Sequence, residues 1–156
     1  MKYKKLLISF FSILLLNSCG YKSLNSEKIN NYKINQLDIK GDEKIIYKLK
    51  NNIRVYSTNN SKLIYDIKIN LITLKESKIK NTAGKITRYS KILLANTVVT
   101  NAYNQSEYKK NFNSTSDYDV GSTHSETLNN EKNAAENNLN YISSEIIKYL
   151  NLLSLQ

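Results

Sequence analysis

The chain has 156 residues, with 23 Lys and Arg against 13 Asp and Glu, a formal net charge of +10, and 40% hydrophobic residues. This length suits one domain of ordinary size and is too short for two. With one Cys, one His, one Met and no Trp or Pro, the chain cannot build a Cys/His zinc site or an internal disulfide. The four glycines are scattered, which excludes a phosphate loop or a dinucleotide fingerprint.

The positive charge is almost all lysine and accompanies many Asn, Ile and Tyr residues, a composition typical of AT-rich coding sequences. The net charge is therefore weak evidence for a nucleic-acid partner, and we expect none. We also expect no enzyme and no cofactor. His124 falls in the first turn of a predicted helix with no partner nearby in sequence, and the closest carboxylates are Asp117 and Asp119.

The N-terminus carries the pattern of a signal peptide. Three lysines within Met1–Lys5 precede the uncharged stretch Leu6–Leu16. As a helix this stretch would rise about 16 Å, roughly half of a hydrocarbon core, which suits a signal peptide and is too short to span a membrane.

The residues after this stretch resemble the bacterial lipobox, in which a signal peptidase cleaves before a lipidated cysteine. Leu16 stands three residues before Cys19 and Ser18 one before, while Asn17 departs from the usual small residue. We predict that residues 1–18 are removed and that Cys19 receives the acyl chains that anchor the protein in a membrane. The alternative is an ordinary signal peptide followed by a chance cysteine.

After a polar tether over residues 19–31, the pattern predicts a strand and then a helix. Tyr32–Ile39 is rich in β-branched and aromatic residues, with a change of phase near Asn35-Gln36. Asp42 is placed to cap a helix that ends near Ser57. The apolar residues of this helix form one stripe: Ile45, Ile46, Leu49, Ile53 and Tyr56.

The pattern in the middle of the chain predicts three strands. Alternation predicts a strand over Leu63–Leu74, and the polar segment Lys75–Lys85 is expected to be a long hairpin loop. Ile86–Tyr103 is rich in β-formers but has no clear phase. After a turn, Tyr108–Val120 predicts a weaker strand.

The last third is helical. Thr123 and Glu126 form a capping-box pattern, followed by one apolar stripe: Ala135, Leu139, Ile142, Ile146, Tyr149 and Leu153. The order is β-α-β-β-β-α, which predicts one α+β domain over residues 32–156. Because each helix has one stripe, we expect a two-layer sandwich with both helices on one face of a four-stranded sheet. The other face would be polar or covered by something else.

Three segments resemble one known family. Cys19-Gly20-Tyr21-Lys22-Ser23-Leu24 is similar to the opening of the LPS-assembly lipoprotein family LptE, with Ser23 replacing the usual Pro. Thr87–Leu94 resembles the central strand of that family, which begins with an Arg. Asn130–Leu139, followed by Ile142 and Ile146, resembles its closing helix.

The resemblance implies a non-enzymatic protein of the outer membrane. Members of the LptE family plug the β-barrel LptD, assist its assembly and help deliver lipopolysaccharide to the outer leaflet. Gly20, rather than Asp, follows Cys19. By the enterobacterial sorting rule this favours the periplasmic face of the outer membrane.

Lipopolysaccharide carries phosphates, and the planar fork of an arginine suits them. The candidate ligand-binding residues are the cations around one hairpin: Lys78, Lys80, Lys85, Arg88 and Lys91. The alternative is a solvated loop in a lysine-rich protein.

Two other functions remain open at this point. The chain could be a free-standing periplasmic lipoprotein that binds lipid or peptidoglycan, or an accessory chaperone of another outer-membrane barrel. A lipid carrier would need a large apolar cavity.

Overall fold

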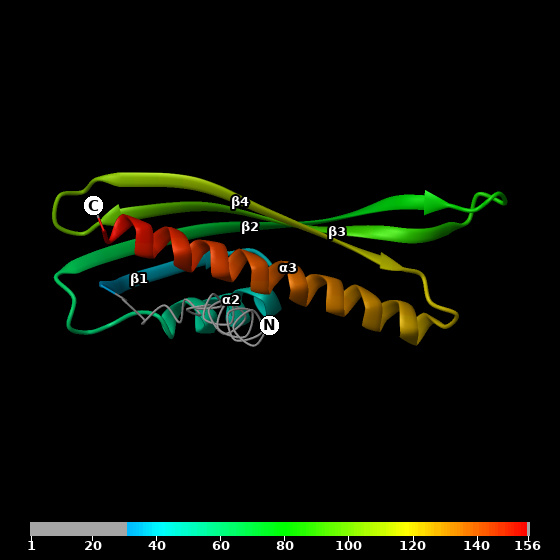
Figure 1. Cartoon of the computed structure of the whole chain (residues 1–156), viewed down its shortest axis with the longest axis horizontal. Helices are drawn as coiled ribbons and strands as arrows, with labels where there is room; N and C mark the ends of the chain where they lie inside the picture. The colour runs from blue at the N-terminus through cyan, green and yellow to red at the C-terminus, as the bar shows by residue number, and fades with distance from the viewer. Residues whose placement is uncertain (1–30, 156) are drawn as a thin grey trace, which may run out of the picture.

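Four strands and two helices make up residues 31–155, the part of the chain that this computed structural model describes (Figure 1). The predicted signal peptide, Cys19 and the tether up to residue 30 lie outside the described residues. The elements in chain order are β1 (Tyr32–Lys40), α2 (Glu43–Arg54), β2 (Leu63–Lys80), β3 (Ile86–Asn101), β4 (Glu107–Asp119) and α3 (His124–Leu153). The predicted α+β order is confirmed.

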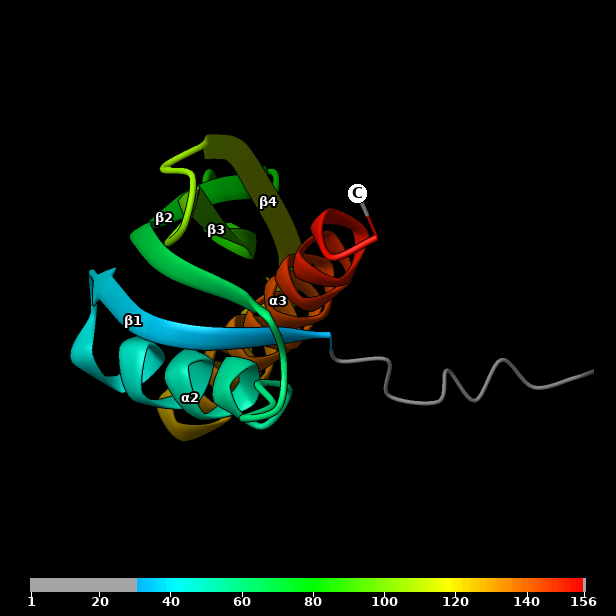
Figure 2. The same ribbon diagram turned by 90° about the vertical axis from the view of Figure 1, so that its left-hand side faces the viewer.

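The strands form one mixed sheet in the order β1-β2-β3-β4. β1 runs parallel to β2, since α2 carries the chain back across the sheet, and the β2–β3 and β3–β4 pairs are antiparallel. Both helices lie on the same side of the sheet, α2 below β1 and α3 along β4 and β3 (Figures 1 and 2).

A bulge in β1 explains its change of phase. The register with β2 shifts between Ile34 and Gln36. Asp66 of β2 stabilises the irregular backbone, because its carboxylate accepts hydrogen bonds from the side chain of Asn35 at 2.8 Å and from the Gln36 N–H at 3.1 Å. The sequence prediction of a break at this point is confirmed.

The start of α2 depends on a close approach to β2. Gly41 has φ +141°, and a Cβ there would lie 2.8 Å from the Cβ of Leu71, so a side chain would clash. Asp42 then caps the helix as predicted by accepting from the Lys44 N–H at 2.9 Å.

The prediction of a long loop over Lys75–Lys85 is wrong. β2 continues to Lys80, and only the turn over residues 81–85 is left between the strands. The side chain of Asn81 closes this turn by accepting from the N–H groups of Ala83 and Lys85. Pairing with β3 satisfies the backbone of this polar segment, so tertiary context overrides its weak strand propensity.

The hairpin projects beyond the rest of the sheet. Register places Asp119, the last residue of β4, opposite Arg88 of β3, so the tip of the β2–β3 hairpin extends past β4 (Figure 1).

The long helix α3 begins at the predicted cap. Thr123 accepts from the Glu126 N–H at 3.1 Å. The reciprocal bond differs from a capping box, because the Glu126 carboxylate accepts from the N–H of Ser122 at 2.8 Å and not from that of Thr123. The buried face of α3 is also turned slightly from the predicted stripe, since Ala134 and Leu150 are buried whereas Ala135 and Tyr149 lie at its border.

The core lies between the sheet and the two helices. Its fully buried apolar side chains come from both layers: Tyr32, Leu49, Ile53, Tyr65, Ile67, Ile69, Val99, Ile142, Ile146 and Leu150. The opposite side of the sheet, called here the open face, carries no helix (Figure 2). It is largely polar, with one apolar patch where Ile72 is paired with Leu94 and Leu74 with Ile92.

Candidate functional site

The five predicted cations all lie on the β2–β3 hairpin, but they do not form one cluster. Lys78 and Arg88 point to the open face, where their partners are residues of β4. Lys91 lies on the face toward α3. Lys80 and Lys85 flank the turn at the tip.

Arg88 already uses its planar fork inside the protein. Its Nε donates to one carboxylate oxygen of Asp119 at 2.6 Å and a terminal nitrogen donates to the other at 3.2 Å. The hydrogen bonds from Arg88 lower the pKa of the Asp119 carboxyl. A phosphate bound by Arg88 would therefore have to displace Asp119, the partner that sequence spacing did not reveal.

Lys78 also forms an ion pair with β4, with Asp117, two residues before Asp119. Its ammonium donates to Asp117, which also accepts from the hydroxyl of Ser90 at 2.7 Å. Hydrogen bonds from Lys78 and then from Ser90 lower the pKa of the Asp117 carboxyl. Asp117 and Asp119, the two acidic residues near the end of β4, thus both serve as ion-pair partners of the hairpin.

On the other face, Glu131 of α3 lies between two lysines of the hairpin. Lys75 donates to one oxygen of its carboxylate at 2.7 Å and Lys91 donates to the other at 2.8 Å. The ammonium of Lys75 also lies 4.5 Å from the ring centre of Tyr89 and 5.5 Å from that of Tyr118. We call these five residues the Glu131 cluster.

Ion pairs in the cluster connect the first half of α3 to the hairpin. Burial alone would raise the pKa of Glu131, but the hydrogen bonds from Lys75 and Lys91 outweigh it and lower the pKa from 4.5 to about 2. Sequence reasoning missed both Lys75 and Glu131. They stand 56 positions apart, and no short-range pattern indicates such a pair.

Replacing Glu131 by Gln is expected to lower the free energy of unfolding at pH 7 by about 1–2 kcal/mol, a value reduced for the partial exposure of the pair. Because the folded pKa is depressed, the stabilisation is complete above about pH 4.5 and is lost as the pH falls toward 2. Urea unfolding of both proteins between pH 7 and pH 2.5 measures the difference.

Glu136→Gln is the matched control. Glu136 lies on the same helix and pairs with Lys48, but both side chains are about half exposed, so its loss should cost about 0.5 kcal/mol or less. Equal losses from the two variants would contradict a special role for the Glu131 cluster.

The tip of the hairpin carries the two lysines that remain free. Among residues 31–155, no carboxylate pairs with Lys80 or Lys85, and both side chains are exposed. Ile79 is exposed beside them. Of the five predicted cations, these two could bind an external anion without first losing an internal partner.

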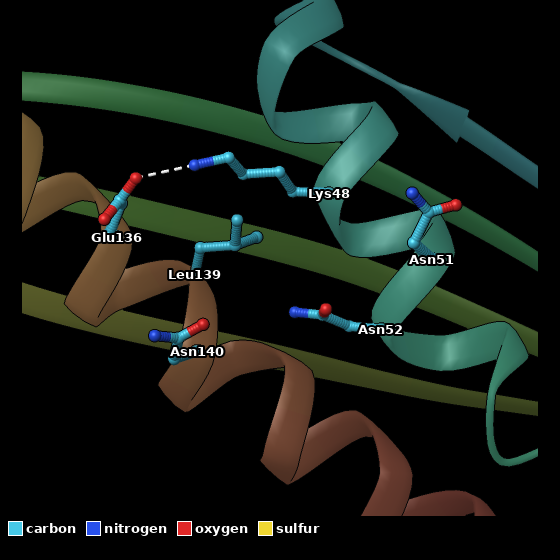
Figure 3. Close-up of a pocket in the computed structure, with 6 residues that line it drawn as sticks. All are labelled: Lys48, Asn51, Asn52, Glu136, Leu139 and Asn140. Carbon is cyan, nitrogen blue, oxygen red and sulfur yellow. Dashed lines mark hydrogen bonds and ion pairs between the residues drawn. The ribbon is translucent and has the colours of Figure 1, made fainter.

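A polar groove of about 260 Å³ lies between α2 and α3 (Figure 3). Lys48 of α2 reaches across it to Glu136 of α3 at 2.6 Å. Beside this bridge, Asn52 donates to Ser143 at 3.1 Å. The groove thus contains the bonds that join the two helices.

Neither a metal site nor a membrane-spanning helix occurs in the described part of the chain. No three His, Cys, Asp or Glu residues within residues 31–155 gather around a common point. No helix in this range is long and apolar enough to cross a membrane. His124 is exposed at the start of α3.

Solved structures share this arrangement. An uncharacterized lipoprotein B from Nitrosomonas europaea aligns with a TM-score of 0.57 and 12% identity, covering 75% of this chain and 79% of its own. A candidate lipoprotein from Caulobacter crescentus aligns with a TM-score of 0.52 and 9% identity, covering 79% of this chain and 89% of its own. The chain has their fold.

One more solved structure is similar, and two further kinds of comparison found no match. The rare lipoprotein B from Shewanella oneidensis aligns with a TM-score of 0.46 and 11% identity, covering 78% of this chain and 93% of its own. No protein-family model and no curated protein matches the sequence.

Proposed function

We propose that the chain is a lipoprotein of the outer membrane, anchored at its periplasmic face through Cys19, that plugs and assists assembly of an LptD-type β-barrel and helps deliver lipopolysaccharide. The proposal is supported by two features taken together, the lipobox pattern and the fold. A lipobox ending at Cys19 precedes a domain whose fold recurs in the Nitrosomonas lipoprotein B at a TM-score of 0.57.

The surface of the domain supports a plug. The lumen of an outer-membrane barrel is polar, and the open face presents uncharged polar side chains on all four strands: Gln36, Asn70, Asn96, Asn111, Asn113 and Thr115. At these positions the open face can exchange hydrogen bonds with a polar wall without the cost of burying a charge.

The core favours a plug over a lipid carrier. The space between the sheet and the helices is occupied by side chains with no exposed surface, among them Ile67, Ile142 and Ile146. A carrier of acyl chains would need an apolar cavity in that position.

Lys80→Ala combined with Lys85→Ala is expected to weaken binding of the full chain to purified lipopolysaccharide about 3- to 10-fold at low salt. The tip lysines are free, each exposed contact contributes little, and added salt screens it. A titration at about 0.05 M and 0.5 M salt measures the effect.

Lys40→Ala with Lys44→Ala removes the same charge from exposed positions near the start of α2. If the control variant weakens lipopolysaccharide binding as much as the tip variant does, the loss reflects net charge, and the tip is not a specific binding site.

The barrel is tested separately. A tagged full chain extracted in mild detergent should bring with it a large outer-membrane β-barrel, and the tip variant should do so equally well. Recovery of the chain without a barrel would favour the free-standing lipoprotein, and recovery with an unrelated barrel would favour the accessory chaperone.

A further inference from the structure

β4 is an edge strand whose outer backbone groups lack a partner strand. β3 is its only neighbour in the sheet. At the two ends of the β3–β4 ladder, the Asn101 N–H donates to the carbonyl of Ser106 and the Val120 N–H donates to that of Thr87. In an antiparallel pair this pattern alternates, so the even-numbered residues of β4 bond to β3 and the odd-numbered ones direct their N–H and C=O groups outward.

α3 lies along β4 on one face of the sheet, and Asn130 of this helix donates to the carbonyl of Asp119 at 3.1 Å. Three other devices that protect an edge are absent from β4. The register with β3 is regular over the whole of β4, without a bulge. The strand has no proline, and its centre, residues 111–116, carries no charge. Natural edges of this length usually carry a bulge, a proline or a central lysine that blocks the addition of another strand.

A groove runs along this free edge. Four consecutive residues of β4, 113–116, line one side of it, and Asn137 and Tyr141 of α3 line the other, around a volume of about 460 Å³. The Tyr141 side chain is 53% exposed. A strand laid against β4 would fill the groove and cover this ring.

The charges of β4 are complementary to those of a reversed copy of itself. Glu107, Lys109 and Lys110 precede the uncharged centre with a net charge of +1, and Asp117 and Asp119 follow it with a charge of −2. With an antiparallel second copy in a register centred on Ser114, Lys109 lies opposite Asp119, whose carboxylate also accepts from Arg88 of its own chain and retains lone pairs for a second cation.

The same register also places the remaining outward-directed residues of one copy opposite compatible residues of the other. Asn111 lies opposite Asp117 and Asn113 opposite Thr115, and every one of these pairs joins residues whose backbone groups point outward. A register centred one residue earlier would place Glu107 opposite Asp119, two like charges, and is disfavoured.

We propose that β4 is a self-association surface, on which a second copy of this chain adds its own β4 antiparallel about a two-fold axis at Ser114. The result is one continuous sheet with four strands from each copy. The same patch is used by both partners, as two-fold symmetry requires. The inference goes beyond the proposed function, because it needs neither a barrel nor lipopolysaccharide.

Charge reversal tests the pairing. Sedimentation velocity of the full chain over a concentration series should show a monomer–dimer equilibrium, and Lys109→Glu should raise its dissociation constant about tenfold or more, because two symmetry-related attractive pairs become repulsive. Lys109→Glu combined with Asp119→Lys should restore the dimer. Lys68→Glu, on the inner strand β2, is the matched control and should change nothing.

Cysteine exchange tests the register. Asn113→Cys and Thr115→Cys variants, each also carrying Cys19→Ser, are mixed and oxidised. The mixed disulfide between the two variants should exceed the statistical share, since only these two positions lie opposite each other.

A chain that stays monomeric up to about 1 mM, a dimer unaffected by Lys109→Glu, or a statistical distribution of disulfides would each overturn the proposal. In the first case the edge would be open to a strand of a different protein. None of these outcomes bears on the lipid anchor or the barrel, so failure here is distinct from failure of the proposed function.

Discussion

Leu139→Asp is expected to lower the free energy of unfolding by about 3–5 kcal/mol, a large share of the roughly 5–15 kcal/mol that stabilises an ordinary domain. Leu139 is 4% exposed and belongs to the core between α3 and the sheet. The substitution removes apolar burial and forces a carboxylate to lose most of its hydration at a buried position. Urea unfolding followed by circular dichroism measures the loss.

Leu128→Asp and Leu152→Asp are the matched controls. Both leucines lie on α3, one on each side of Leu139, and they are 53% and 55% exposed. The same chemical change there should cost less than about 1 kcal/mol. Similar losses at all three positions would mean that helix propensity, and not the core, accounts for the effect.

Cys19→Ala should abolish both lipidation and cleavage of the chain. Without the thiol no diacylglyceryl group can be attached, and the signal peptidase that requires a lipidated cysteine cannot cleave. The chain should accumulate as a precursor that retains residues 1–18. Growth with labelled fatty acid, followed by gel electrophoresis of the tagged protein, shows both effects.

Ser23→Ala, a change of the same size four residues later, should be labelled and cleaved normally. Labelled fatty acid in the Cys19→Ala variant would show that another residue is modified, and a cleaved but unlabelled wild type would favour an ordinary signal peptide.

Local chemistry was sufficient to predict the order of the elements. The break in β1 near Asn35, the cap at Asp42 and the cap at Thr123 were all visible in the sequence, and the structure confirms them. Each depends on residues within a few positions of one another, because a cap or a change of phase is a short-range property of the backbone.

The length of the hairpin and the partners of its charges were decided by contacts between distant segments. Lys75–Lys80 looks like a loop by its own composition and is a strand because β3 supplies its hydrogen bonds. Arg88 meets Asp119 and Lys91 meets Glu131 only after the strands and α3 have packed.

The sequence by itself thus determined the β-α-β-β-β-α order, the caps and the lipobox pattern at Cys19, because periodicity and capping are local. The tertiary structure decided which of the five predicted cations are neutralised, leaving Lys80 and Lys85 free, and that β4 stands at an edge of the sheet. The physical reason is that an ion pair or a strand edge depends on the register between segments 30 to 60 residues apart, and that register is set by packing of the whole core.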